Sequence, residues 1–398
     1  MKFKSMALLM LTMAMPAMAD QVTVNTQGVS LVLDVENGQP AKYLYFGARL
    51  DERDKANLSV TANGRMDVYP AYGLNTPAES ALALRHADGN MSTALVATGY
   101  DSRQEANATV TVIHLKDAVY PVKVDLCYRA YKAVDLIEAW SEITNEEKGT
   151  VTLTTFASAM LPIRRGNVWM SHLSGTWASE GYVNNELLTP GEFVIRNADG
   201  TRNSHTDHAE VMFSLDGKGQ ENVGRVIGAA LVYGGNYKLK AVTDDTDYHY
   251  FFAGINEENS EYHLRKGETF KTPALALTFS NEGLSGASRN FHKWGRKYVL
   301  AHGSQLRDIL LNSWEGVYFD INQQGMDQMM ADIASMGGEL FVMDDGWFGT
   351  KYQRNSDNCA LGDWEVDRKK LPDGIEGLLR DAKKNGVKFG IWIEPEMT

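Results

Sequence analysis

Three short segments in the last quarter of the sequence combine tryptophan with carboxylates. They are NSWE at 312–315, DDGWFG at 344–349 and WIEPEM at 392–397. A carboxylate accepts hydrogen bonds from vicinal hydroxyls, and an indole covers the apolar C–H face of a sugar ring. The pattern therefore predicts a site for a neutral, hydroxyl-rich ligand, with Trp314, Asp344, Asp345 and Trp392 as candidate residues.

Some of these residues also have a structural interpretation. Trp314 and Trp392 could be core residues, because apolar periodicity alone would also place indoles between strands and helices. Glu394 and Glu396 are two residues apart and would share one face of an ideal strand, as a catalytic pair would. Pro395 is poorly tolerated inside a central strand, so we expect the strand to end there and assign neither glutamate a catalytic role.

Motifs for other chemistries are absent from the sequence. It contains no G-x-G-x-x-G turn, phosphate loop, H-E-x-x-H or other spaced metal cluster, and no G-x-S-x-G elbow. His172, His205 and His208 fall in the N-terminal part, where surface or satisfied buried roles are the default. We therefore expect no cofactor and no metal.

The candidate residues follow elements that alternate between strand and helix. We expect strands at 309–317, 340–343 and 389–393, and helices from Met326 to Gly337 and from Ile375 to Gly386. Such alternation indicates a parallel α/β sheet, either a barrel or a doubly wound fold. Ligands bind at the carboxyl ends of the strands in both folds, which is where the three segments lie.

The preceding part of the chain has the pattern of a large antiparallel β-sandwich. Between residues 21 and 280, short runs of alternating apolar residues are separated by turn signals such as Glu36-Asn37-Gly38 and Leu215-Asp216-Gly217. Near residue 285 the period becomes helical, with Ala287, Phe291, Trp294 and Tyr298 on one face. We expect this segment to connect the sandwich to the α/β part.

Composition and charge restrict the partners. Apolar residues make up 43% of the chain and charged residues 23%, as in ordinary globular proteins. The formal charge is −12 without a basic run, which argues against nucleic acid as a partner. No stretch is apolar for long enough to cross a membrane, so no membrane partner is expected.

The first nineteen residues have the pattern of a cleavable signal peptide. Lys2 and Lys4 precede an apolar stretch, and Ala17-Met18-Ala19 provides a small-residue cleavage site before Asp20. We expect an exported protein, periplasmic or secreted. Cys127 and Cys359 are the two cysteines, and the sequence leaves their pairing open.

The candidate segments resemble glycoside hydrolase family 36, the retaining α-galactosidases. The resemblance rests on four strings in the same order as in the family, and it extends through the β-rich part to most of the chain. It implies a β-supersandwich followed by the first three βα units of a (β/α)8 TIM barrel, a multidomain chain of an all-β and an α/β part. The four strings are LLNSWEGVYFDIN (310–322), ELFVMDDGWFG (339–349), LGDWEVDRKKLPDG (361–374) and KFGIWIEPEM (388–397).

The resemblance also gives domain bounds and site roles. The implied division is a signal peptide at 1–19, the supersandwich at 20–284, a connecting helical segment at 285–305, and the first part of the barrel at 306–398, ending after strand three. Asp344 and Asp345 match the carboxylates that bind galactose hydroxyls, and Trp314 and Trp392 match aromatic residues of the same pocket. Asp363 and Trp364 match a loop that borders it.

The family's catalytic residues are not in this sequence. A retaining glycosidase needs two carboxyl groups about 5 Å apart, as nucleophile and acid/base. In family 36 these are aspartates on strands four and six, so we expect binding residues but no catalytic residue within the 398 residues. The function that the resemblance implies is that of an α-galactosidase. The alternatives to it are an α-N-acetylgalactosaminidase or transglycosylase of the same family, or a noncatalytic carbohydrate-binding protein.

An assembly role is less defined. In relatives, a loop that follows a Tyr-Pro-x-Tyr-Gly motif can reach the active site of a neighbouring subunit. Here Tyr69-Pro70-Ala71-Tyr72-Gly73 is followed by LNTPAES rather than the acidic string typical of the family. The expected partner is an α-galactoside oligosaccharide, and homo-oligomer formation stays open.

Overall fold

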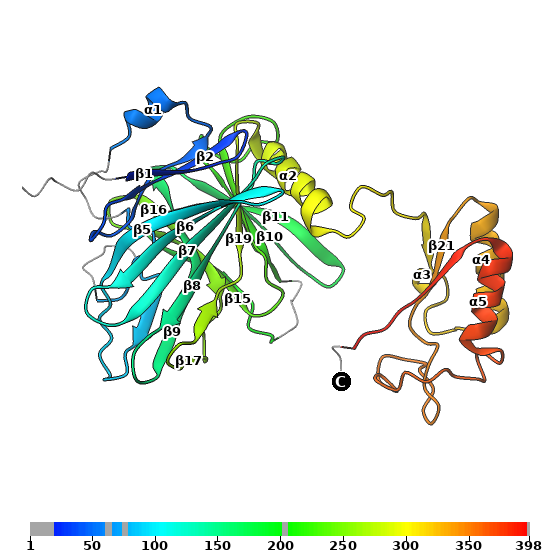
Figure 1. Cartoon of the computed structure of the whole chain (residues 1–398). Helices are drawn as coiled ribbons and strands as arrows, with labels where there is room; N and C mark the ends of the chain where they lie inside the picture. The colour runs from blue at the N-terminus through cyan, green and yellow to red at the C-terminus, as the bar shows by residue number, and fades with distance from the viewer. Residues whose placement is uncertain (1–19, 60–65, 74–78, 201–205, 396–398) are drawn as a thin grey trace, which may run out of the picture. The chain divides into compact units, whose positions relative to one another are not determined.

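The chain divides into two compact units. A computed structural model describes residues 20–59, 66–73, 79–200 and 206–395 (Figure 1). The division falls between Ala301 and His302. The expected signal peptide lies outside the described residues, and the predicted domain bounds at 284 and 306 stay predictions.

The largest described sheet of the first unit is antiparallel and has ten strands, which fan out in Figure 1. Its central strands β8 (Ile137–Asn145) and β19 (Leu275–Ser280) are buried along nearly their whole length, as expected for a sheet that is covered on each side. In order, the strands are β11 (Ser179–Leu187), β10 (Trp169–Thr176), β13 (Asp207–Ser214), β14 (Val226–Leu231), β19 (Leu275–Ser280), β8 (Ile137–Asn145), β7 (Val122–Tyr131), β6 (Ala108–Asp117) and β5 (Leu95–Gln104), and β18 (Thr269–Lys271) pairs with β8.

Two smaller antiparallel sheets complete the described part of this unit. Edge-to-face contact between Phe213 of β13 and Phe251 of β16, with ring centroids 5.0 Å apart, joins the two larger sheets. A single apolar cluster contains residues of all three sheets. The smaller sheets comprise β12 (Gly191–Arg196), β15 (Tyr237–Thr243), β16 (Tyr248–Ile255), β9 (Val151–Arg165), β17 (Tyr262–Leu264) and β4 (Leu82–Arg85), and then β1 (Asp20–Asn25), β2 (Val29–Val35) and β3 (Lys42–Ala48). The predicted sandwich is thus confirmed.

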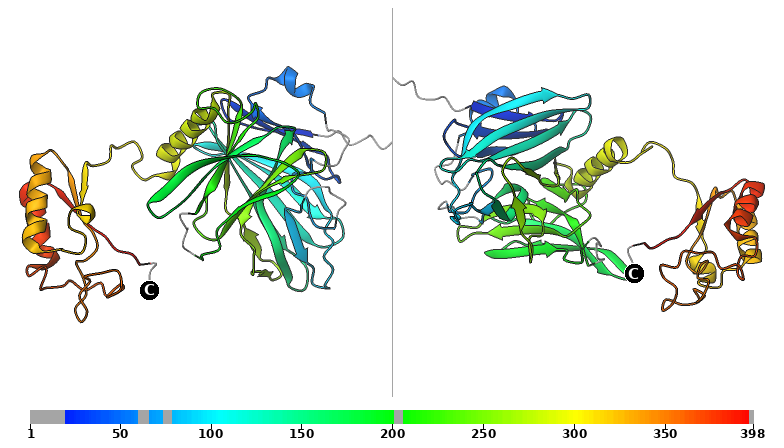
Figure 2. Two further views of the ribbon diagram at one scale, coloured as in Figure 1. Left: turned by 180° about the vertical axis from the view of Figure 1, so that it is seen from behind. Right: turned by 60° about the horizontal axis from the view of Figure 1, so that its bottom comes forward.

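Helices of the first unit lie outside the sheets. The short α1 (Glu52–Ala56) begins at Asp51, whose side chain accepts a hydrogen bond from the Asp54 backbone N–H. The predicted helix near residue 285 is α2 (Gly283–Trp294), continued by a π-helical turn at Gly295–Val299. It packs against β14 and β19, and Tyr298 stacks on Tyr131 with centroids 4.5 Å apart. Figure 2 shows this helix in yellow beside the strands of the first unit.

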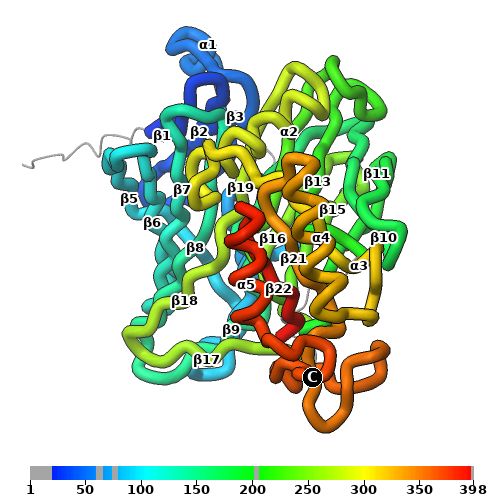
Figure 3. Tube along the Cα trace, turned by 90° about the vertical axis from the view of Figure 1, so that its right-hand side faces the viewer, coloured from blue at the N-terminus to red at the C-terminus, as the bar shows by residue number. Residues whose placement is uncertain are grey.

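The second unit contains a parallel sheet with three described strands. They are β20 (Leu310–Asn312), β21 (Leu340–Met343) and β22 (Lys388–Ile391), with β21 in the centre. The helices α4 (Gln323–Ser335) and α5 (Gly374–Asn385) lie side by side (Figure 3). Phe341 and Met343 of β21 are buried in one cluster with Met330 and Leu378 of these helices. The predicted βα alternation is confirmed.

Two strand predictions were too long. The strand expected at 309–317 ends at Asn312, and residues 314–317 form the helical turn α3 (Trp314–Val317). The reason is local: the Asn312 side-chain oxygen accepts a hydrogen bond from the Trp314 backbone N–H at 2.7 Å, which turns the chain out of the sheet. The third strand ends at Ile391 rather than Ile393, before Pro395.

The helix ends agree better with the sequence. Helix α5 ends at Gly386, which adopts φ = +73° in the left-handed region, as glycine does most readily. Helix α4 ends shortly before Gly337, which also adopts a left-handed conformation, with φ = +88°.

Both cysteines are described and neither forms a disulfide: Cys127 is buried in β7 and Cys359 is half-buried in the second unit. In the described parts of the chain, no helix has the length and apolarity to span a membrane.

Candidate carbohydrate-binding site

The ends of β20 and β21 bring Asn312 and Asp344 into contact. The strands run parallel with Asn312 opposite Val342, so the segments that follow both strands leave the sheet at the same end. The Asn312 side-chain amide donates to Asp344 Oδ2 at 2.6 Å. The Ser313 hydroxyl accepts from the Asp344 backbone N–H at 3.0 Å. The first predicted segment thereby positions the second.

The Asp344 carboxylate is half-buried and held at both oxygens. Its Oδ1 accepts the Asp345 backbone N–H at 2.8 Å, while Oδ2 accepts the amide of Asn312. A carboxylate offers about four lone-pair positions, so these two bonds leave acceptor capacity for ligand hydroxyls. The geometry suits the predicted binding role of Asp344, which stays a prediction.

Asp345 has a different environment although it is the next residue. Its side chain is 7% exposed and forms a bidentate ion pair with Arg354, whose side chain is 3% exposed. Arg354 Nη2 donates to Oδ2 at 2.8 Å and Nε donates to Oδ1 at 3.0 Å. These bonds raise the pKa of the Arg354 guanidinium. The predicted sugar ligand Asp345 therefore has a buried protein partner.

Arg354 also organises the long loop between β21 and α5. Its Nη1 donates to the backbone carbonyls of Asp357 and Cys359, each at 2.8 Å. The guanidinium lies near the rings of Phe319 and Phe348, at 5.4 and 5.8 Å from their centroids. One side chain thus connects Asp345 to the loop that follows it.

Lys370 ties the loop after β20 to the loop after β21. Its Nζ donates to the backbone carbonyls of Phe319 at 2.9 Å, Gly346 at 2.8 Å and Arg354 at 3.0 Å. Burial lowers the pKa of Lys370. Gly346 adopts φ = +108°, and a Cβ there would lie 3.0 Å from the Phe319 backbone. The close approach of the two loops therefore requires glycine at this position.

Two of the predicted indoles, Trp364 and Trp392, contact each other. Trp364 and Trp392 have ring centroids 6.1 Å apart, and Trp364 also contacts Phe348 at 4.6 Å. Trp347 Nε1 donates to the Trp392 carbonyl at 3.0 Å. Trp364 and Trp392 are half-buried against the apolar core, so Trp392 has core contacts as well as a position after β22.

Trp314 makes different aromatic contacts. Its ring meets Tyr318 and Phe319 edge to face, with centroids 5.2 and 5.0 Å away. Asp363 lies in the loop before Trp364, where its Oδ2 accepts the Thr350 backbone N–H at 3.2 Å. The structure therefore joins Trp364 to Trp392 directly and places Trp314 beside the Phe319 ring that lies against Arg354.

Other predicted residues have simpler outcomes. Glu394 is half-buried just after β22, whereas Glu396 and His205 lie outside the described residues. His172 is buried between the sheets and contacts Phe193 at 5.3 Å. Within the described ranges, no group of three or more His, Cys, Asp or Glu side chains could hold a metal ion.

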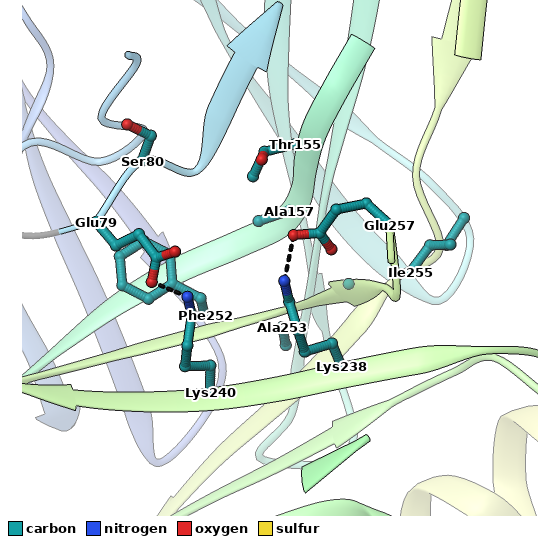
Figure 4. Close-up of a pocket in the computed structure, with 11 residues that line it drawn as sticks. Glu79, Ser80, Thr155, Ala157, Lys238, Lys240, Phe252, Ala253, Ile255 and Glu257 are labelled. Carbon is teal, nitrogen blue, oxygen red and sulfur yellow. Dashed lines mark hydrogen bonds and ion pairs between the residues drawn. The ribbon is translucent and has the colours of Figure 1, made fainter. Parts of the chain in front are cut away.

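The second unit has an open groove beside the site. It has a volume of about 590 Å³, within the usual range for ligand pockets. It shares Phe319 and Lys370 with the contacts described above, and Tyr318 and Asn355 also line it. A second hollow, in the first unit, has a volume of only about 20 Å³, and its lysines are paired with Glu79 and Glu257 (Figure 4). None of the six candidate binding residues lines the groove of the second unit.

Arg354 and Lys370 were missed by the sequence analysis. Each is a basic residue in a polar segment, and no local pattern distinguishes it from a solvated charge. The fold is an antiparallel β unit followed by parallel βα units, and the candidate carboxylates and indoles lie at or near the strand ends, where ligands bind in such α/β folds.

Comparison with known proteins gives the family. The model for the glycosyl hydrolase family 36 N-terminal domain matches residues 39–265, and the melibiase model matches residues 269–398. The chain is 32% identical to alpha-galactosidase C of Emericella nidulans, over 74% of this chain and 40% of that protein. It is 30% identical to alpha-galactosidase AgaA of Geobacillus stearothermophilus, over 86% of this chain and 49% of that protein.

Solved structures agree with these matches. A crystal structure of an AgaA variant in complex with stachyose has a TM-score of 0.87 and 26% identity, covering 95% of this chain and 56% of that one. Another AgaA variant was crystallised in complex with raffinose. This chain belongs to glycoside hydrolase family 36, the α-galactosidase family. It spans about half the length of the curated relatives it matches, 40% of alpha-galactosidase C and 49% of AgaA.

Proposed function

We propose that this chain supplies the sandwich and the galactose-binding strand ends of an α-galactosidase. The whole enzyme would hydrolyse terminal non-reducing α-D-galactose from oligosaccharides by a retaining double displacement. The observation that carries this proposal is the Asp344 carboxylate, fixed by Asn312 at the carboxyl edge of the parallel sheet. The stachyose and raffinose complexes of AgaA support raffinose-type oligosaccharides as the substrate class.

In this proposal, binding and catalysis come from different strands. Asp344 accepts hydrogen bonds from two adjacent galactose hydroxyls, while Trp314 and Trp392 cover the apolar face of the ring. Asp345, Asp363 and Trp364 shape the same pocket. The nucleophile and the acid/base lie about 5 Å apart in retaining enzymes, and the family resemblance puts both on strands four and six. In this proposal, these 398 residues bind the terminal galactose of a substrate but do not hydrolyse its glycosidic bond.

Calorimetric titration of the 398-residue chain with galactose tests the proposal. We expect saturable binding of galactose, no comparable binding of glucose, and a loss of at least roughly tenfold in affinity in Asp344→Asn, because a carboxylate accepts stronger hydrogen bonds than an amide. Asp332→Asn, at an exposed position of α4, is the matched control and should bind like the wild type. Absence of galactose binding would contradict the proposal.

An aryl α-galactoside provides the second arm. We expect no hydrolysis by the 398-residue chain, and turnover by it would place the catalytic pair within these residues. Turnover of aryl α-N-acetylgalactosaminide by the whole protein would favour the alternative sugar. Binding without any hydrolysis by the whole protein would favour a noncatalytic carbohydrate-binding protein.

We also propose that the protein is exported, on the pattern of residues 1–19. Homo-oligomer formation is open, because residues 74–78 of the relevant loop lie outside the described residues.

A further inference from the structure

We propose that Arg354 is the positioning residue of the galactose subsite, acting on the sugar only through Asp345. This inference rests on the proposed function and deepens it. The charge of Arg354 is buried, since its side chain is 3% exposed.

The first step is the geometry of the ion pair. Arg354 Nε donates to both oxygens of Asp345, at 3.0 and 3.2 Å, and Nη2 donates to Oδ2 at 2.8 Å. A bidentate pair of this kind fixes the plane of the carboxylate as well as its place. The orientation of Asp345, and of the peptide that joins it to Asp344, is therefore set by Arg354.

The second step concerns what holds Arg354. The bonds from Nη1 to the carbonyls of Asp357 and Cys359 leave the guanidinium with partners on two sides. The Arg354 carbonyl in turn accepts a hydrogen bond from Lys370, which also holds Gly346. Arg354 is thus anchored by its backbone and its side chain, so it acts as a fixed support rather than a mobile surface charge.

The third step connects this support to the binding carboxylate. The Asp345 backbone N–H is the donor to Asp344 Oδ1 at 2.8 Å. A shift of Asp345 therefore moves one of the two bonds that hold the proposed sugar ligand. A hydrogen bond to a charged group contributes about 1.5–3 kcal/mol, so a residue with no contact to the sugar can control its affinity through the position of the carboxylate that binds it.

A double-mutant cycle on galactose affinity tests the proposal. We expect Arg354→Met to weaken galactose binding roughly tenfold to a hundredfold in the wild-type chain, as the loss of a hydrogen bond to a charged group would. Arg354→Lys keeps the charge but lacks the planar guanidinium, so its galactose affinity should lie between those of the wild type and Arg354→Met. In the Asp345→Asn background, Arg354→Met should change the dissociation constant by less than about twofold, because the residue through which it acts is already altered. An equal loss in both backgrounds, or no loss in either, would overturn the proposal.

A second measurement keeps the inference testable if galactose does not bind. Cys359 is half-buried in the loop held by Arg354, whereas Cys127 is buried in the sandwich and serves as an internal control. We expect Arg354→Met to raise the rate of Cys359 alkylation by iodoacetamide at least roughly tenfold, because the loop opens more often once its anchor is lost. The rates are compared at an alkaline pH at which the thiol is ionised in both proteins, since hydrogen bonding with the Asn355 backbone and also the charge of Arg354 lower the pKa of Cys359. The Cys127 rate should stay unchanged, which would exclude general unfolding.

The control variant for both readouts is Arg380→Met on α5. The Arg380 side chain is 67% exposed, and its loss should leave galactose affinity and Cys359 alkylation at wild-type values. Wild-type chain that does not bind galactose would contradict the proposed function alone. An unchanged alkylation rate in Arg354→Met would overturn the anchoring role of Arg354, whatever the outcome with the sugar.

Discussion

The side-chain amide of Asn312 donates to the carboxylate of Asp344 at 2.6 Å, across the ends of two neighbouring parallel strands. The two residues are thirty-two positions apart in the sequence, and the βα crossover between them places both at one edge of the sheet. This single bond makes the orientation of the proposed sugar ligand depend on the pairing of β20 with β21.

Removal of this donor should weaken the site without unfolding it. We expect Asn312→Ala to lower galactose affinity roughly tenfold, because a hydrogen bond to a charged group contributes about 1.5–3 kcal/mol. Titration calorimetry on the variant gives the value. Asn385→Ala in α5 is the matched control, since Asn385 bonds only within its own helix region, to the Asp381 carbonyl. Equal affinities of the two variants would exclude a role for Asn312.

The contact between the two larger sheets should be a major source of stability in the first unit. Phe213 is fully buried against Phe251. We expect Phe213→Ala to reduce the free energy of unfolding of this unit by about 3–5 kcal/mol, through lost burial and the cavity left behind. Urea unfolding followed by circular dichroism measures the change. Val223→Ala, at a position 65% exposed, should stay within about 0.5 kcal/mol of the wild type.

His114 should make the stability of the ten-stranded sheet depend on pH. Partial burial opposes its charged form, but hydrogen bonds and charge from Asp125 and Asp101 outweigh burial and raise the pKa of His114. Because the folded pKa is the higher one, the stabilisation is complete below the ordinary histidine pKa of about 6.5 and is lost as pH rises through the raised value.

Unfolding midpoints at several pH values, for the wild type and His114→Gln, test this effect. The advantage of the wild type should be greatest in mild acid, should shrink as the pH becomes alkaline, and should be smaller in high salt because the ring is partly exposed. An advantage that does not vary with pH would show that the ring acts through packing alone.

Cleavage after Ala19 should leave Asp20 as the first residue of the exported protein. Intact-mass analysis of the periplasmic or secreted fraction measures this directly. A bulky residue at the cleavage site, as in Ala19→Phe, should block processing and retain the full-length mass, because the site requires small residues. Full-length protein found only in the cytoplasm would contradict the proposed export.

Much of the second unit could be predicted from local sequence patterns. The run Leu340–Met343 forms a strand with the predicted bounds, and Gly386 ends α5 as its position after the apolar pattern indicated. Prediction failed where a polar side chain competed with the backbone. Trp314 and Val317 extended the apparent apolar run of the strand, but the bond from the Trp314 N–H to Asn312 turns this segment into a helix.

The candidate site was predictable to the extent that it follows strand ends. Asp344 and Trp392 each come directly after a strand, so the parallel topology alone brings them to one edge. The partner of Asp345 could not be predicted in this way. Arg354 lies nine residues further on in an irregular loop, and an ion pair across such a loop leaves no periodic signal in the sequence.

The three acceptors of Lys370 are backbone carbonyls rather than side chains. Replacement of the side chain at Phe319 or Arg354 therefore leaves the carbonyl available, and among the acceptors only Gly346 is restricted, by its backbone conformation. The connection between the two loops is thus tolerant to sequence drift at most of its contact points. During divergence of the loops, a single lysine could preserve their relative position while new side chains change which sugars are accepted.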